Sequence, residues 1–265
     1  MAELLQQFGF DEARRQSHKL LAEDYRFAPA FPAGQAFKTV HERVFMEETP
    51  LAVVRELHLQ HSAAPHSSLE LTLALALNGF PDAMTLLDRF VHGFQRFVPP
   101  ERVRNIHQTN QIGEFGVAWQ WDPRSDGLLD VMAFVRHNVL VAASAHDPEP
   151  GLVLALAVQI DRELNALSTV QDYAEPGRLS IDRAECAPRV AAGGRLELRD
   201  FGAEDRDGAT LFFVPSSGSV NRDPANPQRW YYRAGEKRGT QQIMLYRVAR
   251  GGILPARQRL NVEVA

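Results

Sequence analysis

The stretch VMAFVRHNVLVAASAH, residues 131–146, sets the fold expected for the first part of the chain. Small and bulky apolar residues alternate on both sides of the polar triplet RHN, residues 136–138. Two runs with a period of two, separated by a few polar residues, are typical of a β-hairpin. Asn138 tolerates left-handed backbone geometry at such a turn. A catalytic His137 would need a nucleophile or metal partner, and its sequence neighbours supply none. The pattern therefore predicts a turn.

Outward from this hairpin, other segments share the same patterning. LELTLALAL, residues 69–77, places leucine at every second position, which predicts a strand with one strongly apolar face. We expect further strands in PLAVVRELHLQH, VRNIHQTNQ and FGVAWQW, which are residues 50–61, 103–111 and 115–121. Apolar residues at helical spacing predict helices over residues 2–25, 81–97 and 150–167.

The hydrophobic pattern of the sequence changes at STVQDYAEPGR, residues 168–178. Beyond it no helix-length periodic segment occurs, and short alternating runs lie between Gly, Pro and Asp clusters. The runs are LSIDRAEC, GRLELRD, ATLFFV, RWYYRAG, QQIMLYRVA and RLNVEVA. We therefore predict an α+β protein with two domains, an antiparallel-sheet α/β sandwich over residues 1–170 and an all-β sandwich over residues 176–265.

Two resemblances accompany these patterns. IGEFGVAW, followed by VMAFVRHNVLVAAS and a helix LALAVQIDREL, resembles the second half of the Mog1/PsbP-like (LpqN/DcrB-type) α/β/α sandwich families. The resemblance covers mainly residues 111–167, within a wider match over residues 38–167. It marks five scaffold positions: Gly113, Gly116, Arg136, Asn138 and Asp161.

The second part resembles bacterial immunoglobulin-like domains, with PRVAAGGRLELRD as a first hairpin and WYYRAG with GTQQIMLY as a late strand pair. It lacks the paired cysteines of antibody domains. Members of both groups are mostly non-enzymatic, and they bind partners, assist secretion or space domains. The resemblance implies a binding or adaptor role by analogy alone.

Composition narrows the function classes. The chain has 265 residues, of which 45% are hydrophobic and 23% charged, and its net charge of −4 argues against a nucleic-acid surface. Its one cysteine, Cys186, excludes an intramolecular disulfide and a cysteine-based zinc site. We expect no membrane span and, because the start lacks a secretory signal, a cytoplasmic protein; the alternative is the cell envelope if the native start has been removed.

Two clusters carry ligands that suit metals. His58, His61 and His66 lie within HLQHSAAPH, and with His41 or Glu42 they would form a zinc site, the basis of an alternative function as a metal-dependent hydrolase. On a strand, however, His58 and His61 would point to opposite faces.

The loop RDFGAEDRDG contains closely spaced carboxylates that suit Ca²⁺, although the EF-hand spacing is absent. These carboxylates are Asp200, Glu204, Asp205 and Asp207.

Aromatic residues mark the candidate binding surfaces. Trp119 and Trp121 share one strand face, where they would line either a core or a groove. Trp230 and Tyr232 follow a polar loop and would contact a partner at its rim. Alternation along the strand would instead bury either Tyr231 or its two neighbours in the sandwich core. Taken together, the sequence predicts a non-enzymatic binding or adaptor protein with a protein partner, engaged through the α/β domain, and the β-sandwich as a second contact or spacer.

Overall fold

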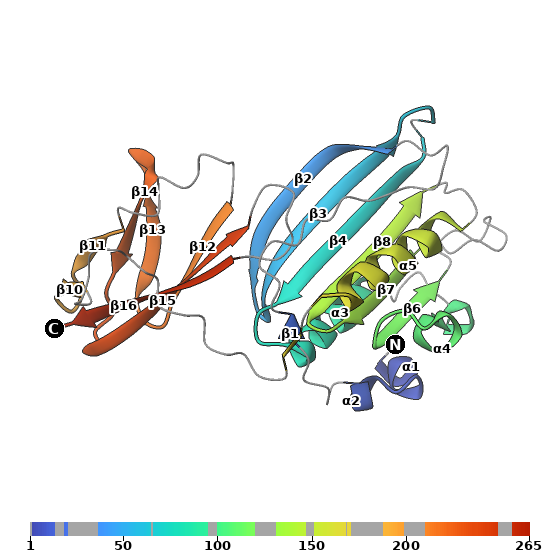
Figure 1. The fold of residues 1–265 in the computed structure, drawn as a ribbon, viewed down its shortest axis with the longest axis horizontal. Helices are drawn as coiled ribbons and strands as arrows, with labels where there is room; N and C mark the ends of the chain where they lie inside the picture. Colours follow the sequence, from blue (N-terminus) through green and yellow to red (C-terminus); the bar gives the residue numbers. More distant parts are fainter. Residues whose placement is uncertain are drawn as a thin grey trace. The chain divides into compact units, whose positions relative to one another are not determined.

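The computed structural model divides the chain into two compact units, Met1–Asp172 and Tyr173–Ala265 (Figure 1). The structure describes the following residues: 2–13, 19–20, 37–64, 66–94, 100–119, 131–146, 151–167, 169–170, 188–198, 210–248 and 256–265. Strands outnumber helices in the described part of both units, and nearly all strand pairings are antiparallel.

The first unit is built on a seven-stranded sheet whose order is β2-β3-β4-β8-β7-β6-β5. Every neighbouring pair in it is antiparallel. In that spatial order the strands are β2 (Phe37–Glu48), β3 (Leu51–His61), β4 (Ser68–Ala76), β8 (Val139–His146), β7 (Val131–Arg136), β6 (Phe115–Trp119) and β5 (Arg104–Asn105). The predicted strands around residues 50–61, 69–77 and 115–121 are confirmed as β3, β4 and β6.

The predicted hairpin at residues 131–146 is confirmed, since β7 and β8 pair from Val131↔Ser144 to Arg136↔Val139. The left-handed residue of its turn is His137, with φ 57°, and not Asn138 as the sequence suggested. Asn138 is instead fully buried, and its side-chain amide donates to the Ala76 carbonyl oxygen. That bond ties the turn to β4, so the position requires an amide for its hydrogen bond.

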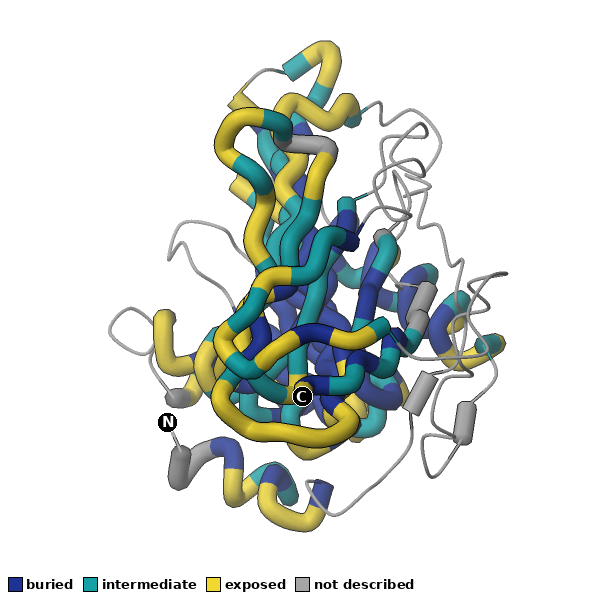
Figure 2. The backbone as a smooth tube through the Cα atoms, turned by 90° about the vertical axis from the view of Figure 1, so that its left-hand side faces the viewer, coloured by how far each residue is buried: buried dark blue, intermediate teal, exposed yellow. Residues whose placement is uncertain are grey.

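Helices cover both faces of this sheet (Figure 1). The predicted helices at residues 81–97 and 150–167 are confirmed as α3 (Phe80–Phe94) and α5 (Leu152–Asn165). α3 shares a core with Val131, Ala133 and Val135, which lie on one face of β7. α5 lies on the opposite face, because its Asp161 bonds Arg136, which alternates with those residues. Cover on both sides explains why all of β6 and the first five residues of β7 and of β8 are buried. Figure 2 shows such buried backbone, in dark blue, in the interior.

Three expectations for the first unit need correction. The helix predicted over residues 2–25 is two short helices, α1 (Ala2–Gln7) and α2 (Phe10–Ala13), with Gly9 at φ 84° between them. β1 (Lys19–Leu20) follows and pairs with β9 (Thr169–Val170). The strand predicted over residues 103–111 is mostly α4 (Ile106–Asn110), preceded by η1 (Pro100–Arg102) and by the two residues of β5. The long strand β2 was not predicted.

The second unit has two sheets, of order β10-β16-β15-β12 and β11-β14-β13. Their strands are β10 (Arg189–Val190), β16 (Ala256–Val264), β15 (Gly239–Val248), β12 (Thr210–Pro215), β11 (Arg195–Glu197), β14 (Asn226–Arg233) and β13 (Ser219–Asp223). One hydrophobic core takes residues from both sheets, including Leu211 and Ile243 from the first and Tyr232 from the second. The arrangement is therefore a β-sandwich, and among its described strands only β10 and β16 pair in parallel.

The pairing corrects both hairpins expected in this unit. β10 pairs with β16 and β11 with β14, so PRVAAGGRLELRD is not a hairpin. β14 pairs with β11 and β13, whereas β15 pairs with β12 and β16, so WYYRAG and GTQQIMLY belong to different sheets. The run LSIDRAEC and Cys186 lie outside the described residues.

Candidate functional site

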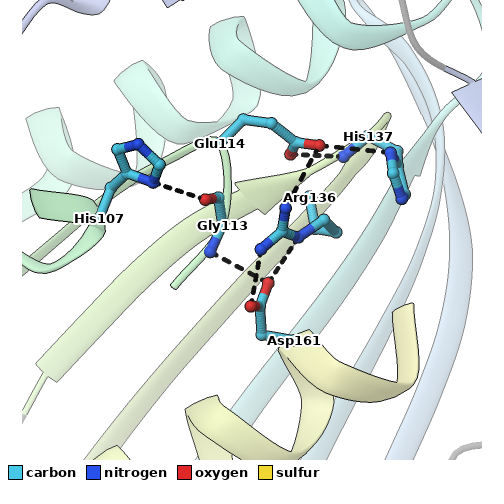
Figure 3. A network of polar contacts seen from close by, with 6 residues as sticks. All are labelled: His107, Gly113, Glu114, Arg136, His137 and Asp161. Carbon is cyan, nitrogen blue, oxygen red and sulfur yellow. Dashed lines mark hydrogen bonds and ion pairs between the residues drawn. The ribbon is translucent and has the colours of Figure 1, made fainter. Parts of the chain in front are cut away.

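A cluster of charged side chains lies at the turn between β7 and β8. Its centre is Arg136, whose guanidinium donates from Nε and Nη2 to the two carboxylate oxygens of Asp161, both at 2.7 Å (Figure 3). Both side chains are nearly buried, at 14% and 10% exposure. Burial disfavours the charged guanidinium, but the hydrogen bonds to Asp161 and the nearby Glu114 carboxylate outweigh it and raise the pKa of Arg136.

Glu114 completes the cluster from the residue before β6. Its Oε1 lies 3.6 Å from Arg136 Nη1, and its Oε2 accepts the backbone N–H of His137 at 2.7 Å. β6 and β7 pair at Phe115↔Val135, and this register places Glu114 beside Arg136. Burial raises the pKa of Glu114, against the opposing influence of Arg136 and the His137 N–H. The carboxyl group therefore holds a proton to higher pH than an exposed glutamate does.

His137 contributes the fourth ionisable group. Its ring Nδ1 lies 3.3 Å from Glu114 Oε1, and the imidazole is 10% exposed. The left-handed backbone at this residue, φ 57°, costs a non-glycine residue roughly 1–2 kcal/mol. The hydrogen bond from its backbone N–H to Glu114 holds this conformation in place. His137 thus has an acidic partner that its own sequence neighbourhood does not reveal.

The backbone around Gly113 fits closely against the cluster. Gly113 N–H donates to Asp161 Oδ1 at 3.0 Å, and its carbonyl oxygen lies 2.7 Å from Nδ1 of His107 (Figure 3). Gly113 has φ 70°, and a Cβ there would lie 2.7 Å from the Val135 carbonyl oxygen. At Gly116 a Cβ would meet Phe134 Cβ at 2.7 Å. Both positions therefore require glycine for close approach of β6 to β7.

The cluster is a buried network of ion pairs and hydrogen bonds in which Glu114 can hold a proton. Two carboxylates face one guanidinium, so a proton on Glu114, whose pKa is raised by burial, balances the charges of Arg136, Asp161 and Glu114. Asp161 accepts from both Arg136 and Gly113, so α5 is tied to the β7–β8 turn and to the segment before β6. All five scaffold positions implied by the family resemblance make such structural contacts, whereas Glu114 and His107 were missed.

The three histidines considered for a metal site are not brought together as ligands. His58 Nδ1 lies 3.4 Å from Glu70 Oε1, and its ring centroid is 5.7 Å from that of His41 on β2. His61 Nδ1 instead accepts the backbone N–H groups of Ala63 and Ala64. Among the residues that the structure describes, no group of three or more His, Cys, Asp or Glu side chains is arranged to hold a metal ion. Asp200, Glu204, Asp205 and Asp207 lie outside those residues.

The aromatic candidates lie mainly in the interior. Trp119 is 1% exposed and belongs to the core beneath α3, and Tyr232 is 0% exposed. The Tyr232 hydroxyl donates to the Ser217 carbonyl oxygen at 2.9 Å, and burial raises its pKa. Trp230 packs against the sandwich core beside Phe213, with ring centroids 4.7 Å apart. None of these three side chains stands out as a contact surface; Trp121 lies outside the described residues.

A second feature of the first unit is its open edge. β2 ends the seven-stranded sheet, and within the described chain it pairs with β3 alone. The first half of β2 is exposed from Lys38 to Arg43, and Val40 is 54% exposed. The pairing register shifts between Thr39 and His41, which marks a β-bulge at Val40. The edge therefore presents backbone groups and one apolar side chain to solvent.

Comparison of the chain with family models, with curated proteins and with solved structures gives no match. The fold and the cluster define the class: a two-unit, mostly β protein whose first unit is clamped by a buried ion-pair network. No helix in the described residues has both the length and the apolar character needed to cross a bilayer.

Proposed function

We propose that this chain is a non-catalytic adaptor that holds an extended segment of a partner polypeptide along β2. The observation that carries the proposal is the edge itself, a strand of 12 residues that pairs with one neighbour, β3, in the part of the chain that the structure describes. An edge strand presents a row of backbone N–H and C=O groups that a second extended chain can pair with. The chemistry recognised is therefore extended polypeptide backbone.

The exposed half of β2 also supplies selectivity. Glu42 and Arg43 already form ion pairs with Arg55 and Glu56 of β3, at 2.9 and 3.2 Å. The charged side chains and the bulge at Val40 hinder indiscriminate pairing of two such edges. Val40, 54% exposed, offers an apolar contact at the centre of this half. A partner segment would pair with the backbone and place an apolar side chain against Val40.

The rest of the first unit suits a rigid support for this edge. The buried cluster of Glu114, Arg136, His137 and Asp161 uses its polar groups on one another, and it fixes α5 to the sheet. This agrees with the non-enzymatic character of the Mog1/PsbP-like families that residues 111–167 resemble. We assign the second unit, as an immunoglobulin-like sandwich, the role of a second contact or spacer.

Site-specific photocrosslinking tests the proposal. A benzophenone amino acid replaces Val40 in one variant and Gln108, an exposed residue of α4, in a matched control. We expect Val40 to crosslink to a defined peptide segment of a partner and Gln108 not to do so. The purified partner should then bind Val40→Lys about tenfold more weakly than the unmodified chain and Gln108→Lys with unchanged affinity.

Two results would contradict the adaptor proposal. One is a partner that crosslinks equally from both positions, and the other is an affinity that Val40→Lys leaves unchanged. A chemical turnover by the pure protein that is abolished by Glu114→Gln would contradict its non-catalytic character. Circular dichroism of each variant establishes that its fold is intact before any comparison.

A further inference from the structure

The outer face of the sheet β11-β14-β13 in the second unit carries an arginine cluster. Tyr232 of β14 is 0% exposed and belongs to the sandwich core, so its neighbours Tyr231 and Arg233 point to the opposite side. Register places Arg195 on β11 opposite Arg233, and Ser219 on β13 opposite Arg233 from the other side. Arg195, Arg233 and Ser219 are all exposed and form one row across the sheet.

This row places two like charges directly opposite each other. Side chains at opposing positions of antiparallel strands have Cβ atoms about 4.5–5.5 Å apart, and like charges there destabilise the sheet. Within the described residues, neither Arg195 nor Arg233 has an ion-pair partner. Repulsion between two arginines that no described acidic side chain neutralises is a local loss of stability. Such losses are typical of functional sites, where a ligand can supply the opposite charge.

The next row fixes the orientation of one of these arginines. Tyr231 lies between Glu197 of β11 and Asn221 of β13. The guanidinium carbon of Arg195 lies 3.4 Å from the centroid of the Tyr231 ring. A guanidinium at this distance stacks on the ring and keeps its N–H donors free at its edge, in a geometry that suits carboxylates. Tyr231 therefore pre-orients Arg195 at little entropic cost.

The acidic groups nearby do not neutralise the cluster. Glu197 is 3.6 Å from the Nε of Arg229, which adds a third arginine to this face. Asp223 Oδ1 accepts the backbone N–H of Ala225 in the turn between β13 and β14. Glu236, exposed in the loop after β14, is followed by Lys237 and Arg238. The outer face therefore keeps an excess of positive charge in a chain whose net charge is −4.

We propose that this face binds an acidic segment of a polypeptide through its carboxylates. In an extended segment, side chains two residues apart lie on one side, about 6.5–7 Å from each other. Two such carboxylates can reach Arg195 and Arg233 together, each as a charge-assisted hydrogen-bonded pair. A long polyphosphate chain would need a continuous basic stripe, whereas the described part of this face has three arginines, one of which is paired with Glu197. The inference concerns a different surface from β2, so either can fail alone.

The test uses the full chain and a fluorescent peptide of alternating glutamate and threonine, with a glutamine–threonine peptide as the neutral comparison. Fluorescence anisotropy measures binding at low and at physiological ionic strength. We expect the acidic peptide alone to bind, with an affinity that falls as salt rises. Arg195→Gln/Arg233→Gln should weaken binding about tenfold or more, since it removes two charge-assisted contacts.

Matched variants separate this site from general charge. Arg104→Gln/Arg162→Gln removes the same charge from two exposed arginines of the first unit and should leave the affinity unchanged. Tyr231→Phe keeps the stacking ring and the affinity, whereas Tyr231→Leu should weaken binding. The proposal is overturned by the absence of acidic-peptide binding, by equal loss in both double variants, or by tighter binding of a heparin oligosaccharide of matched charge.

Discussion

Arg136 of β7 and Asp161 of α5 form a bidentate pair with two 2.7 Å hydrogen bonds, which ties the helix to the sheet. The pair is nearly buried, so removing Asp161 leaves Arg136 with only the 3.6 Å contact to Glu114 in a medium that solvates charge poorly. It also stands at the only left-handed turn of the described hairpin, next to His137. We therefore expect the stability of the first unit to depend more on this pair than on an exposed ion pair such as Arg43–Glu56.

Asp161→Asn should lower the free energy of unfolding of the first unit by about 3 kcal/mol, because buried Arg136 loses its bidentate partner and keeps only the longer contact with Glu114 at 3.6 Å. Urea denaturation followed by tryptophan fluorescence measures the change. As a control, Arg43→Gln breaks a pair whose arginine is 57% exposed, and it should cost under about 1 kcal/mol. Equal effects of the two substitutions would show that the buried pair stabilises the first unit no more than an exposed pair does.

Glu114 predicts a pH dependence of stability. Its pKa is raised above the ordinary value of 4.5, so between the two pKa values the folded chain binds more protons than the unfolded chain. The corresponding stability is fully present below pH 4.5 and is lost as pH rises through the folded-state pKa. Glu114→Gln, which does not titrate, should remove this part of the slope in denaturation curves taken across pH. The neutral change Gln108→Ala should keep the slope, and a slope unchanged in Glu114→Gln would exclude this origin.

Gly113 and Gly93 give a matched pair of glycine substitutions. Gly113→Ala places a Cβ 2.7 Å from the Val135 carbonyl oxygen at φ 70°, so it should destabilise the first unit by roughly 2 kcal/mol or more. Gly93 lies in α3 with nothing within 4 Å of its added Cβ. Gly93→Ala should therefore stabilise the helix by up to about 1 kcal/mol. Thermal unfolding of both variants checks the sign of each effect.

The sequence predicted best those elements whose residues are buried on both sides or alternate strongly. β7, β8 and α5 are examples, since their apolar positions repeat without interruption. β2 was missed because it is an edge strand whose exposed half has polar residues on both faces. The start of α4 was read as a strand, although Asn105 caps it by accepting the Gln108 N–H. The Asn105–Gln108 spacing was the signal that could have revealed this helix.

The candidate site was only partly visible in the sequence. Arg136 and Asp161 were identified from a family resemblance. Glu114 is placed beside them by the pairing register of β6 and β7, which no local sequence pattern reveals. In the second unit, the run Trp230–Tyr231–Tyr232 left open which ring faces out. The core contacts of Trp230 and Tyr232 place Tyr231 outside, on the same face as Arg195 and Arg233. Trp230 and Tyr232, the binding residues inferred from sequence there, therefore face the core, and Tyr231 between them faces the other side of the sheet.

The arginine row leads to a prediction in which stability and binding move in opposite directions. Arg233→Glu replaces the like-charge pair with an opposite-charge pair across β11 and β14, so it should raise the free energy of unfolding of the second unit by roughly 0.2–1 kcal/mol. The same substitution places a carboxylate where the acidic ligand would bind, so binding of the glutamate–threonine peptide should be lost. Arg238→Glu, a charge reversal at an exposed residue outside the row, should change neither quantity appreciably. Denaturation and anisotropy on the same preparations measure both quantities. If Arg233→Glu destabilised the second unit, Arg195 and Arg233 would not repel each other in the native chain. The physical reason for a ligand at this face would then be absent.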